Sequence, residues 1–144
     1  MFKEVPKNIL FISLVGLIPL IVGSILSFKI KILPQKESEL LIKISLQYGA
    51  FILCFMSGCV FFCCINAREK TNYLWLSIIP IVLSVIGLNF PLLTGFILAL
   101  GFLYLLEIER KLYKLQLTPV WWITLRMPMT FFVLINLIII GFNI

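Results

Sequence analysis

The stretch TPVWWITLRMPMT, residues 118–130, decides the fold, because it opens an apolar run in which Arg126 is the last charged residue of the chain. Residues 119–142 have a length that matches a membrane crossing, since an α-helix rises about 1.5 Å per residue and about 20 residues span the hydrocarbon core. Thr118 can cap a helix, and Pro119 suits a first helical turn. We therefore expect a membrane-spanning helix that carries one cation.

The composition of the whole chain agrees with a membrane protein. The 144 residues are 62% hydrophobic and 12% charged, against about 25% charged in soluble domains, and the mean hydropathy is +1.15. Asp and His are absent, which excludes a Ser-His-Asp triad, an Asp pair and any imidazole ligand. The net charge of +6 lies in short segments between apolar runs, so we interpret it as a topology signal and expect no nucleic-acid partner.

Five apolar runs divide the chain, at about 8–28, 46–66, 73–90, 92–109 and 119–142. They predict an all-α, polytopic membrane protein: a compact bundle of about five transmembrane helices that forms a single domain over residues 1–144. Four crossings remain the alternative, with the third and fourth runs as a re-entrant pair. The first run resembles a signal peptide, but it is too long and lacks a cleavage site, so we expect an uncleaved anchor.

Lysine and arginine counts predict the orientation. With the N-terminus inside, the inside segments hold eight such residues and the outside segments four. Because cytoplasmic loops are enriched in these residues, the count favours an N-terminus inside and a C-terminus outside. The inside residues are Lys3, Lys7, Arg68, Lys70, Arg110, Lys111, Lys114 and Arg126, and the outside residues are Lys29, Lys31, Lys36 and Lys43.

Small or helix-breaking residues recur every three or four positions and define one face of each of the first four helices. Such faces let helix backbones approach closely, which is how helices associate when the surrounding lipid is as apolar as their side chains. We therefore expect packing at Gly16, Pro19, Gly23 and Ser27; at Gln47, Ala50, Cys54 and Gly58; at Ser77, Pro80, Ser84 and Gly87; and at Gly95 and Ala99.

Four cysteines, Cys54, Cys59, Cys63 and Cys64, all lie in the second run. Their spacing matches no zinc motif, no histidine can complete a site, and side chains on one helix at these positions do not converge. We interpret them as small buried hydrophobes and expect neither a metal nor a cofactor.

The lone Arg126 has a candidate partner in Glu109. An antiparallel hairpin of the last two helices brings both to a similar depth, near Trp121 and Trp122, and an ionisable group below the interface usually pairs or faces the bundle interior. Glu107, by contrast, has cations three and four residues later and pairs locally. The alternative for Arg126 is snorkelling, in which its long stem lifts the guanidinium to the headgroups.

The motifs GLIP (16–19), YGAFILCFMSG (48–58), LSIIP (76–80), ERK (109–111) and TPVWWITLRMPMT occur in this order. Together they resemble the bacterial inner-membrane proteins of the domain of unknown function 3429, to which mitochondrial transmembrane protein 69 is similar. The strongest matches, which we expect to pack helices, are Tyr48-Gly49-Ala50, Ser77 with Pro80, and Leu125-Arg126 with Thr130.

The chain departs from this family where Phe62-Cys63 replaces Trp-Gly and where Glu109 replaces Asp. The resemblance implies a five-helix layout in the bacterial inner membrane, or in the mitochondrial inner membrane of a eukaryote, and it implies no reaction. The segments at 16–24 and 77–87 also look alike, with an Ile-Pro step 61 positions apart, but the likeness ends there and chance explains it.

Three classes of function remain. A non-catalytic membrane component (an assembly factor, scaffold or small subunit) ranks first, because reactive side chains are scarce. Its partners would be the lipid bilayer and other membrane proteins. A small transporter or channel ranks second, since the prolines could break helices but no charge lies near the membrane centre. An intramembrane enzyme ranks last, because nothing pairs a nucleophile with a base.

Overall fold

The computed structural model describes residues 5–28, 34–66 and 71–144, and these residues form helices and turns without a strand. The topology residues Lys3, Lys29, Lys31, Arg68 and Lys70 lie outside the described residues. In order, the helices are α1 (Lys7–Val15), α2 (Ile18–Ser27), α3 (Gln35–Asn66), α4 (Thr71–Leu76), α5 (Ile79–Asn89), α6 (Thr94–Lys114) and α7 (Val120–Asn143).

Three segments are long and apolar enough to cross a membrane: Lys7–Ser27, Gln35–Ile65 and Val120–Asn143. The first of these combines α1 and α2, and a shorter apolar segment, Tyr73–Asn89, combines most of α4 with α5. These segments confirm an all-helical, apolar chain that fits a multi-pass membrane protein.

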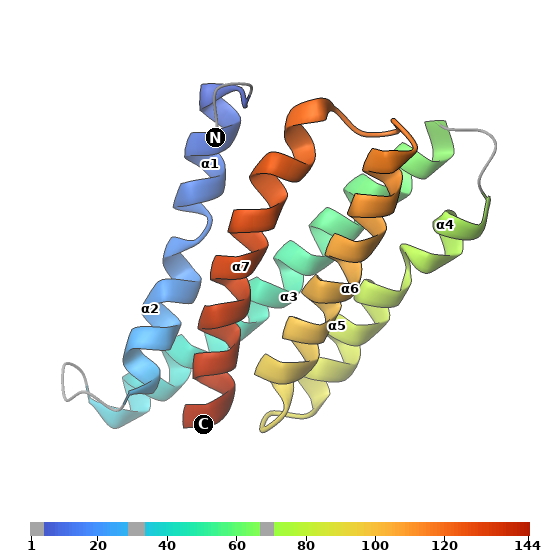
Figure 1. The fold of residues 1–144 in the computed structure, drawn as a ribbon. Helices are drawn as coiled ribbons and strands as arrows, with labels where there is room; N and C mark the ends of the chain where they lie inside the picture. The colour runs from blue at the N-terminus through green and yellow to red at the C-terminus, as the bar shows by residue number, and fades with distance from the viewer. Residues whose placement is uncertain (1–4, 29–33, 67–70) are drawn as a thin grey trace.

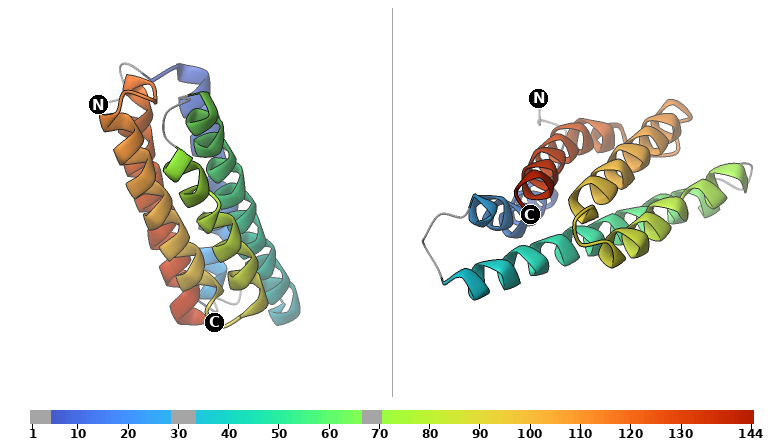
Figure 2. Two further views of the ribbon diagram at one scale, coloured as in Figure 1. Left: turned by 90° about the vertical axis from the view of Figure 1, so that its right-hand side faces the viewer. Right: turned by 90° about the horizontal axis from the view of Figure 1, so that it is seen from below.

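The five segments α1–α2, α3, α4–α5, α6 and α7 lie side by side and alternate in direction (Figures 1 and 2). Contacts run from α2 to α3, α5, α6 and α7 and back to α2, and α3 also touches α6 across this ring. The core between them holds fully buried leucines, among them Leu20, Leu53, Leu98 and Leu137. Large apolar side chains also cover the outside, as expected for a surface that faces lipid. We call the end where α6 turns into α7 the N-terminal end, and the end where α7 stops the C-terminal end (Figure 1).

Helix α3 begins at Gln35, eleven residues before the expected start at 46. The carbonyl of Pro34 accepts the backbone N–H groups of Glu37 and Ser38 at 3.0 and 3.1 Å, so a polar first turn forms directly after the proline. The negative charge of Glu37 in this turn also stabilises the start of the helix, because it lies near the positive end of the helix dipole. Hydropathy alone missed these three turns because their residues are partly charged.

Two of the expected helices are broken near a proline. Pro19 lies in the first turn of α2 and Pro80 in the first turn of α5. A proline lacks an N–H and its ring crowds the preceding turn, so the helix ends before it and starts again. The carbonyl three residues before each proline accepts a hydroxyl from α3 instead: Tyr48 donates to Gly16 at 2.9 Å, and Ser57 donates to Ser77.

Removing one of these hydroxyls should weaken the bundle. We expect Tyr48→Phe to lower the free energy of unfolding by about 1 kcal/mol, because the Gly16 carbonyl loses its hydrogen bond while the ring still packs. The measurement is SDS-induced unfolding of the detergent-solubilised protein. Tyr113→Phe, at a more exposed phenol of α6, serves as the control and should leave stability unchanged; an equal loss in both variants would contradict the role of Tyr48.

Most small residues of the expected faces lie where helices meet. Gly23 packs directly against the Ser45 side chain, whose hydroxyl donates to the Pro19 carbonyl at 2.8 Å. Of the other expected packing residues, Gly49 is buried in the α3 interface, and Gly16 lies half-buried beneath the Tyr48 hydroxyl. The remaining buried members are Ser27, Ala50, Ser77, Pro80, Ser84, Gly87, Gly95, Ala99 and Thr130.

Gly58 corrects one expectation. It is exposed, and a Cβ atom added there would meet nothing within 4 Å. The prediction of a close helix contact at Gly58 is therefore wrong. Cys54 and Gln47 on the same stripe are only half-buried. The reason is the direction of α3: its buried side at this level is instead formed by Leu53, Ser57 and Val60, and Gly58 opens onto a groove.

Candidate functional site

The hairpin of α6 and α7 brings two distant charges together. At the C-terminal end Gly95 of α6 lies against the α7 backbone, and a Cβ there would come within 2.5 Å of the Leu137 carbonyl oxygen. With the helices this close and antiparallel, Glu109 and Arg126 reach the same level near the N-terminal end. Arg126 Nε lies 2.9 Å from Glu109 Oε1 and 3.0 Å from Oε2.

This ion pair is buried inside the bundle. Glu109 is 0% exposed and Arg126 is 9% exposed, so the guanidinium points into the bundle and does not extend over its surface. Trp122, one turn before Arg126, donates its Nε1–H to Glu109 Oε1 at 3.3 Å. Within the described residues, Arg126 Nη2 and Thr130 Oγ1 have no hydrogen-bond partner. The pair is thus a short polar network that ties α6 to α7.

The start of α7 differs in one detail from its expected form. Pro119 is the N-cap residue and makes no side-chain cap, while the Thr118 hydroxyl is buried without a hydrogen-bond partner among the described residues. The expectation that Thr118 caps this helix is therefore wrong. Pro119 itself takes the N-cap position with an extended backbone, so Thr118 lies one residue outside the capping position.

Glu107 shows the contrast expected for a surface carboxylate. Its oxygens lie 4.0 Å from Arg110 Nη1 and 3.9 Å from Lys111 Nζ, and its side chain is 56% exposed. The sequence spacing of three and four residues predicted these local pairs. Such exposed pairs contribute little to stability.

A second polar contact lies deeper in the bundle. Ser24 of α2 donates its hydroxyl to Asn136 Oδ1 of α7 at 2.5 Å, and Asn136 Nδ2 donates to the Phe132 carbonyl of its own helix at 2.8 Å. The oxygen and the nitrogen of the Asn136 side-chain amide therefore each have a hydrogen-bond partner. This hydrogen bond joins α2 to α7 and closes the ring of helices.

A groove of about 590 Å³ runs between α3 and the start of α7, beside the ion pair. Its lining is apolar apart from the thiols, and Trp122 borders both the groove and Glu109. The lining residues are Cys54, Phe55, Gly58, Cys59, Phe62, Cys63, Pro119, Trp121 and Trp122.

Three of the four cysteines share this groove, whereas Cys64 is buried in the core. The groove is wide, so side chains from a broad arc of α3 share it without converging on one point. No group of three potential metal ligands lies close together among the described residues. Phe62 and Cys63 both line the groove.

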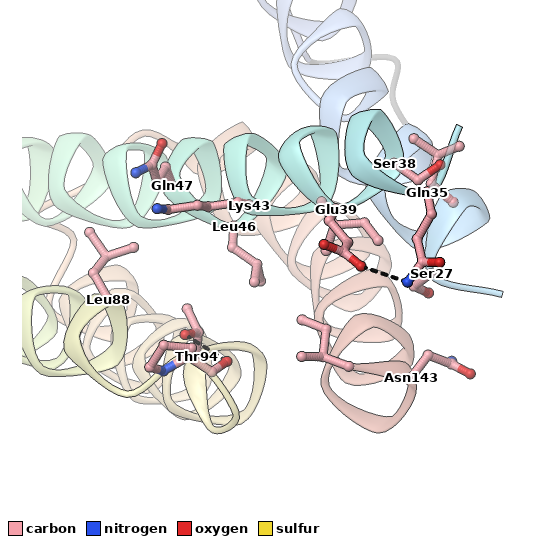
Figure 3. Close-up of a pocket in the computed structure, with 14 residues that line it drawn as sticks. Ser27, Gln35, Ser38, Glu39, Lys43, Leu46, Gln47, Leu88, Thr94 and Asn143 are labelled. Atoms are coloured by element: carbon pink, nitrogen blue, oxygen red, sulfur yellow. Dashed lines mark hydrogen bonds between the residues drawn. The ribbon is translucent and has the colours of Figure 1, made fainter. Parts of the chain in front are cut away.

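The sequence did not predict a larger recess of about 860 Å³ at the C-terminal end (Figure 3). It opens between the first turns of α3, the end of α2, the α5–α6 connection and the end of α7. Its polar members are Ser27, Gln35, Ser38, Glu39, Lys43, Gln47, Thr94 and Asn143. The signal that could have predicted it lies in residues 35–46, where apolar and charged positions alternate with helical spacing.

Comparison with known proteins identifies a family whose function is unknown. The family described as "Protein of unknown function (DUF3429)" matches residues 5–142, nearly the whole chain. No curated protein and no solved structure matches the chain, and the similarity to mitochondrial transmembrane protein 69 stays a prediction. The match covers the broken helices, the buried ion pair and the lining of both hollows except Asn143 and Ile144, and with it the chain belongs to the DUF3429 family of proteins of unknown function.

Proposed function

We propose that this protein is a non-catalytic component of the inner membrane, a scaffold or assembly factor that holds other membrane proteins. The supporting observation is the use of its polar side chains inside the bundle. Glu109 accepts hydrogen bonds from Arg126 and Trp122. Asn136 is hydrogen-bonded to Ser24 and to the backbone of its own helix. Tyr48 and Ser57 bind the carbonyls at the two helix breaks. These groups join helices together, so their arrangement supports a structural role for them.

The outer surface of the bundle supports a role in contacts with other proteins. Besides the lipid-facing leucines and isoleucines, it carries exposed phenylalanines, among them Phe51 and Phe55 on α3 and Phe131 on α7. Helices in a membrane associate through packing of such surfaces and small residues. We assign the bundle five crossings: α1–α2, α3, α4–α5, α6 and α7.

Topology gives the first test of this assignment. A reporter fused after Ile144 should be active only outside the cytoplasm, or outside the matrix, because the Lys and Arg count favours an inside N-terminus and five is odd. The same reporter fused after Gln116, in the α6–α7 connection, should be inactive, because this connection is expected to lie inside. Cytoplasmic activity of the Ile144 fusion would mean an even number of crossings or a reversed orientation.

The role as a scaffold is tested in native membranes. The full chain, tagged at its C-terminus and extracted in a mild detergent, should migrate as part of a larger complex and retain a membrane protein at a fixed stoichiometry in a quantitative pulldown. Glu107→Gln, which leaves the internal contacts intact, should retain the same partner. A protein that migrates alone, whatever its expression level, would contradict the proposal.

A transporter is the second candidate, and one observation favours it. Transporters place substrate sites at broken helices, and this chain has two such breaks and a recess of about 860 Å³. Against it, the carbonyls at the breaks are bound by hydroxyls of α3. Uptake of a solute by proteoliposomes that contain the protein, absent from empty liposomes, would favour transport over a scaffold.

A further inference from the structure

The recess at the C-terminal end has an unusual arrangement of charge. On the first turns of α3 the apolar side chains Leu40, Leu41 and Ile44 are exposed on the outside of the bundle. Glu39 and Lys43 instead line the recess. In a soluble helix the charged face would point outward. Here the outer face carries exposed leucine and isoleucine side chains together with Lys36 and Glu37, while Glu39 and Lys43 remain accessible at the open mouth of the recess. A helix segment that meets lipid close to the membrane surface has this mixture of apolar side chains and charges.

The two charges of the recess do not neutralise each other. Glu39 and Lys43 have the spacing and order that favour a helical ion pair, yet no salt bridge joins them. Glu39 Oε1 accepts a hydrogen bond from Gln35 Nε2 at 3.0 Å, and the Lys43 side chain extends along α3 away from the carboxylate (Figure 3). The mouth of the recess therefore presents an anion and a cation about one helical turn apart, each with bonding capacity to spare.

The buried part of the recess wall is formed by Leu26 and Leu46 together with Ser27 and Thr94, whose hydroxyls donate to helix carbonyls. Leu88 at the end of α5 and Pro91 in the α5–α6 connection line the opposite, more exposed side. A volume of about 860 Å³ falls within the range of ligand pockets, which is about 300–1,000 Å³. The recess thus combines a charged mouth with room for an apolar group behind it.

We propose that the recess binds one zwitterionic phospholipid whose head carries a primary ammonium and a phosphate. The phosphate would lie at Lys43 and the ammonium at Glu39, while the upper part of an acyl chain lies against Leu26, Leu46 and Leu88. A purely anionic head would meet the Glu39 carboxylate and a purely cationic head would meet the Lys43 ammonium, so a head with both charges fits best. The apolar wall and the lipid-facing outer side of α3 favour a lipid over a water-soluble ligand.

The test is native mass spectrometry of the full chain in detergent, offered phosphatidylethanolamine or phosphatidylglycerol with identical acyl chains. The wild-type protein should retain one phosphatidylethanolamine with about tenfold preference, as expected for hydrogen bonds to charged groups. Glu39→Gln should abolish this preference, and Lys43→Gln should weaken retention of both lipids. Equal retention of the two lipids by the wild-type protein would overturn the proposal.

Two further variants separate recognition from folding. The double variant Lys36→Gln/Glu37→Gln removes the same two charges from the same helix at positions that do not line the recess, and it should bind like the wild type. The exchange Glu39→Lys/Lys43→Glu keeps both charges at the mouth and should restore the preference for phosphatidylethanolamine. Loss of binding in the first double variant, with the unfolding transition unchanged, would mean that net charge on α3 and not the recess determines retention.

A competition experiment distinguishes a phospholipid from a water-soluble ligand that has the same head group. O-phosphoethanolamine carries the same ammonium and phosphate without acyl chains, and at concentrations up to the millimolar range it should not displace the lipid. Displacement by O-phosphoethanolamine at the concentration at which the lipid binds would show that the recess serves a water-soluble ligand, and it would overturn the assignment to phospholipid.

Discussion

Replacing Glu109 by Gln is expected to lower the free energy of unfolding by about 3–5 kcal/mol, and Arg126→Gln by a similar amount. The reason is burial. Glu109 is 0% exposed and its two oxygens lie 2.9 and 3.0 Å from Arg126 Nε. Removing either side chain's charge leaves the other in the bundle without a partner, and the apolar surroundings offer it no water. Unfolding in SDS mixed micelles, followed by helicity, measures the loss.

The double variant distinguishes a pair from two independent effects. When both charges are absent, neither is left uncompensated, so Glu109→Gln/Arg126→Gln should recover part of the combined loss, with a coupling energy of about 0.5–3 kcal/mol. Glu107→Gln is the matched control: it is the same change two residues away, at a carboxylate that is 56% exposed, and it should alter stability by less than about 0.5 kcal/mol.

Two outcomes would change the interpretation of this site. Strict additivity of the single variants would show that Glu109 and Arg126 stabilise the bundle separately. Normal stability in both single variants, together with the loss of a cellular phenotype, would mean that the pair serves a functional step, and transport would then replace the scaffold as the leading proposal. The Trp122 indole, which donates to the same carboxylate oxygen, gives an independent check, because its fluorescence should respond to Glu109→Gln.

The ion pair could be predicted from the sequence because few charged residues in the last two apolar runs could form it. Within the last two apolar runs, Arg126 is the only cation far from a helix end, and Glu109 is the carboxylate without a cation three or four residues away. The packing faces of α2 and α5 could be anticipated in the same way, since small residues and prolines recur with helical spacing. These features depend on local periodicity, which a single sequence carries.

Other features depend on directions that periodicity does not contain. The extension of α3 to Gln35 was missed because charged residues look like a loop when only hydropathy is considered, although Pro34 and Glu37 are good helix-start residues. Which side of α3 faces the core also depends on its crossing angles with neighbours. The sequence could not supply those angles, so the groove at Gly58 and the recess at Glu39 and Lys43 both went unpredicted.

The difference between Gly95 and Gly58 leads to the second large expected effect. We expect Gly95→Ala to lower the free energy of unfolding by about 1–3 kcal/mol, because overpacking at a close helix contact forces backbones apart. A Cβ at Gly95 would lie 2.5 Å from the Leu137 carbonyl oxygen and 3.0 Å from the Gly141 backbone, and neither atom can rotate away as a flexible side chain could. The measurement is again SDS-induced unfolding.

Gly58→Ala is the matched control for Gly95→Ala, since it adds the same methyl group to a helical glycine. At Gly58 the added Cβ would meet nothing within 4 Å, so stability should change by less than about 0.5 kcal/mol. Alanine has a higher helix propensity than glycine, so this effect would raise stability at both sites. The two variants therefore differ only in the steric contact of the added Cβ. A loss at Gly58 as large as that at Gly95 would mean that a partner or lipid fills the groove beside α3, and it would make that groove part of an interface.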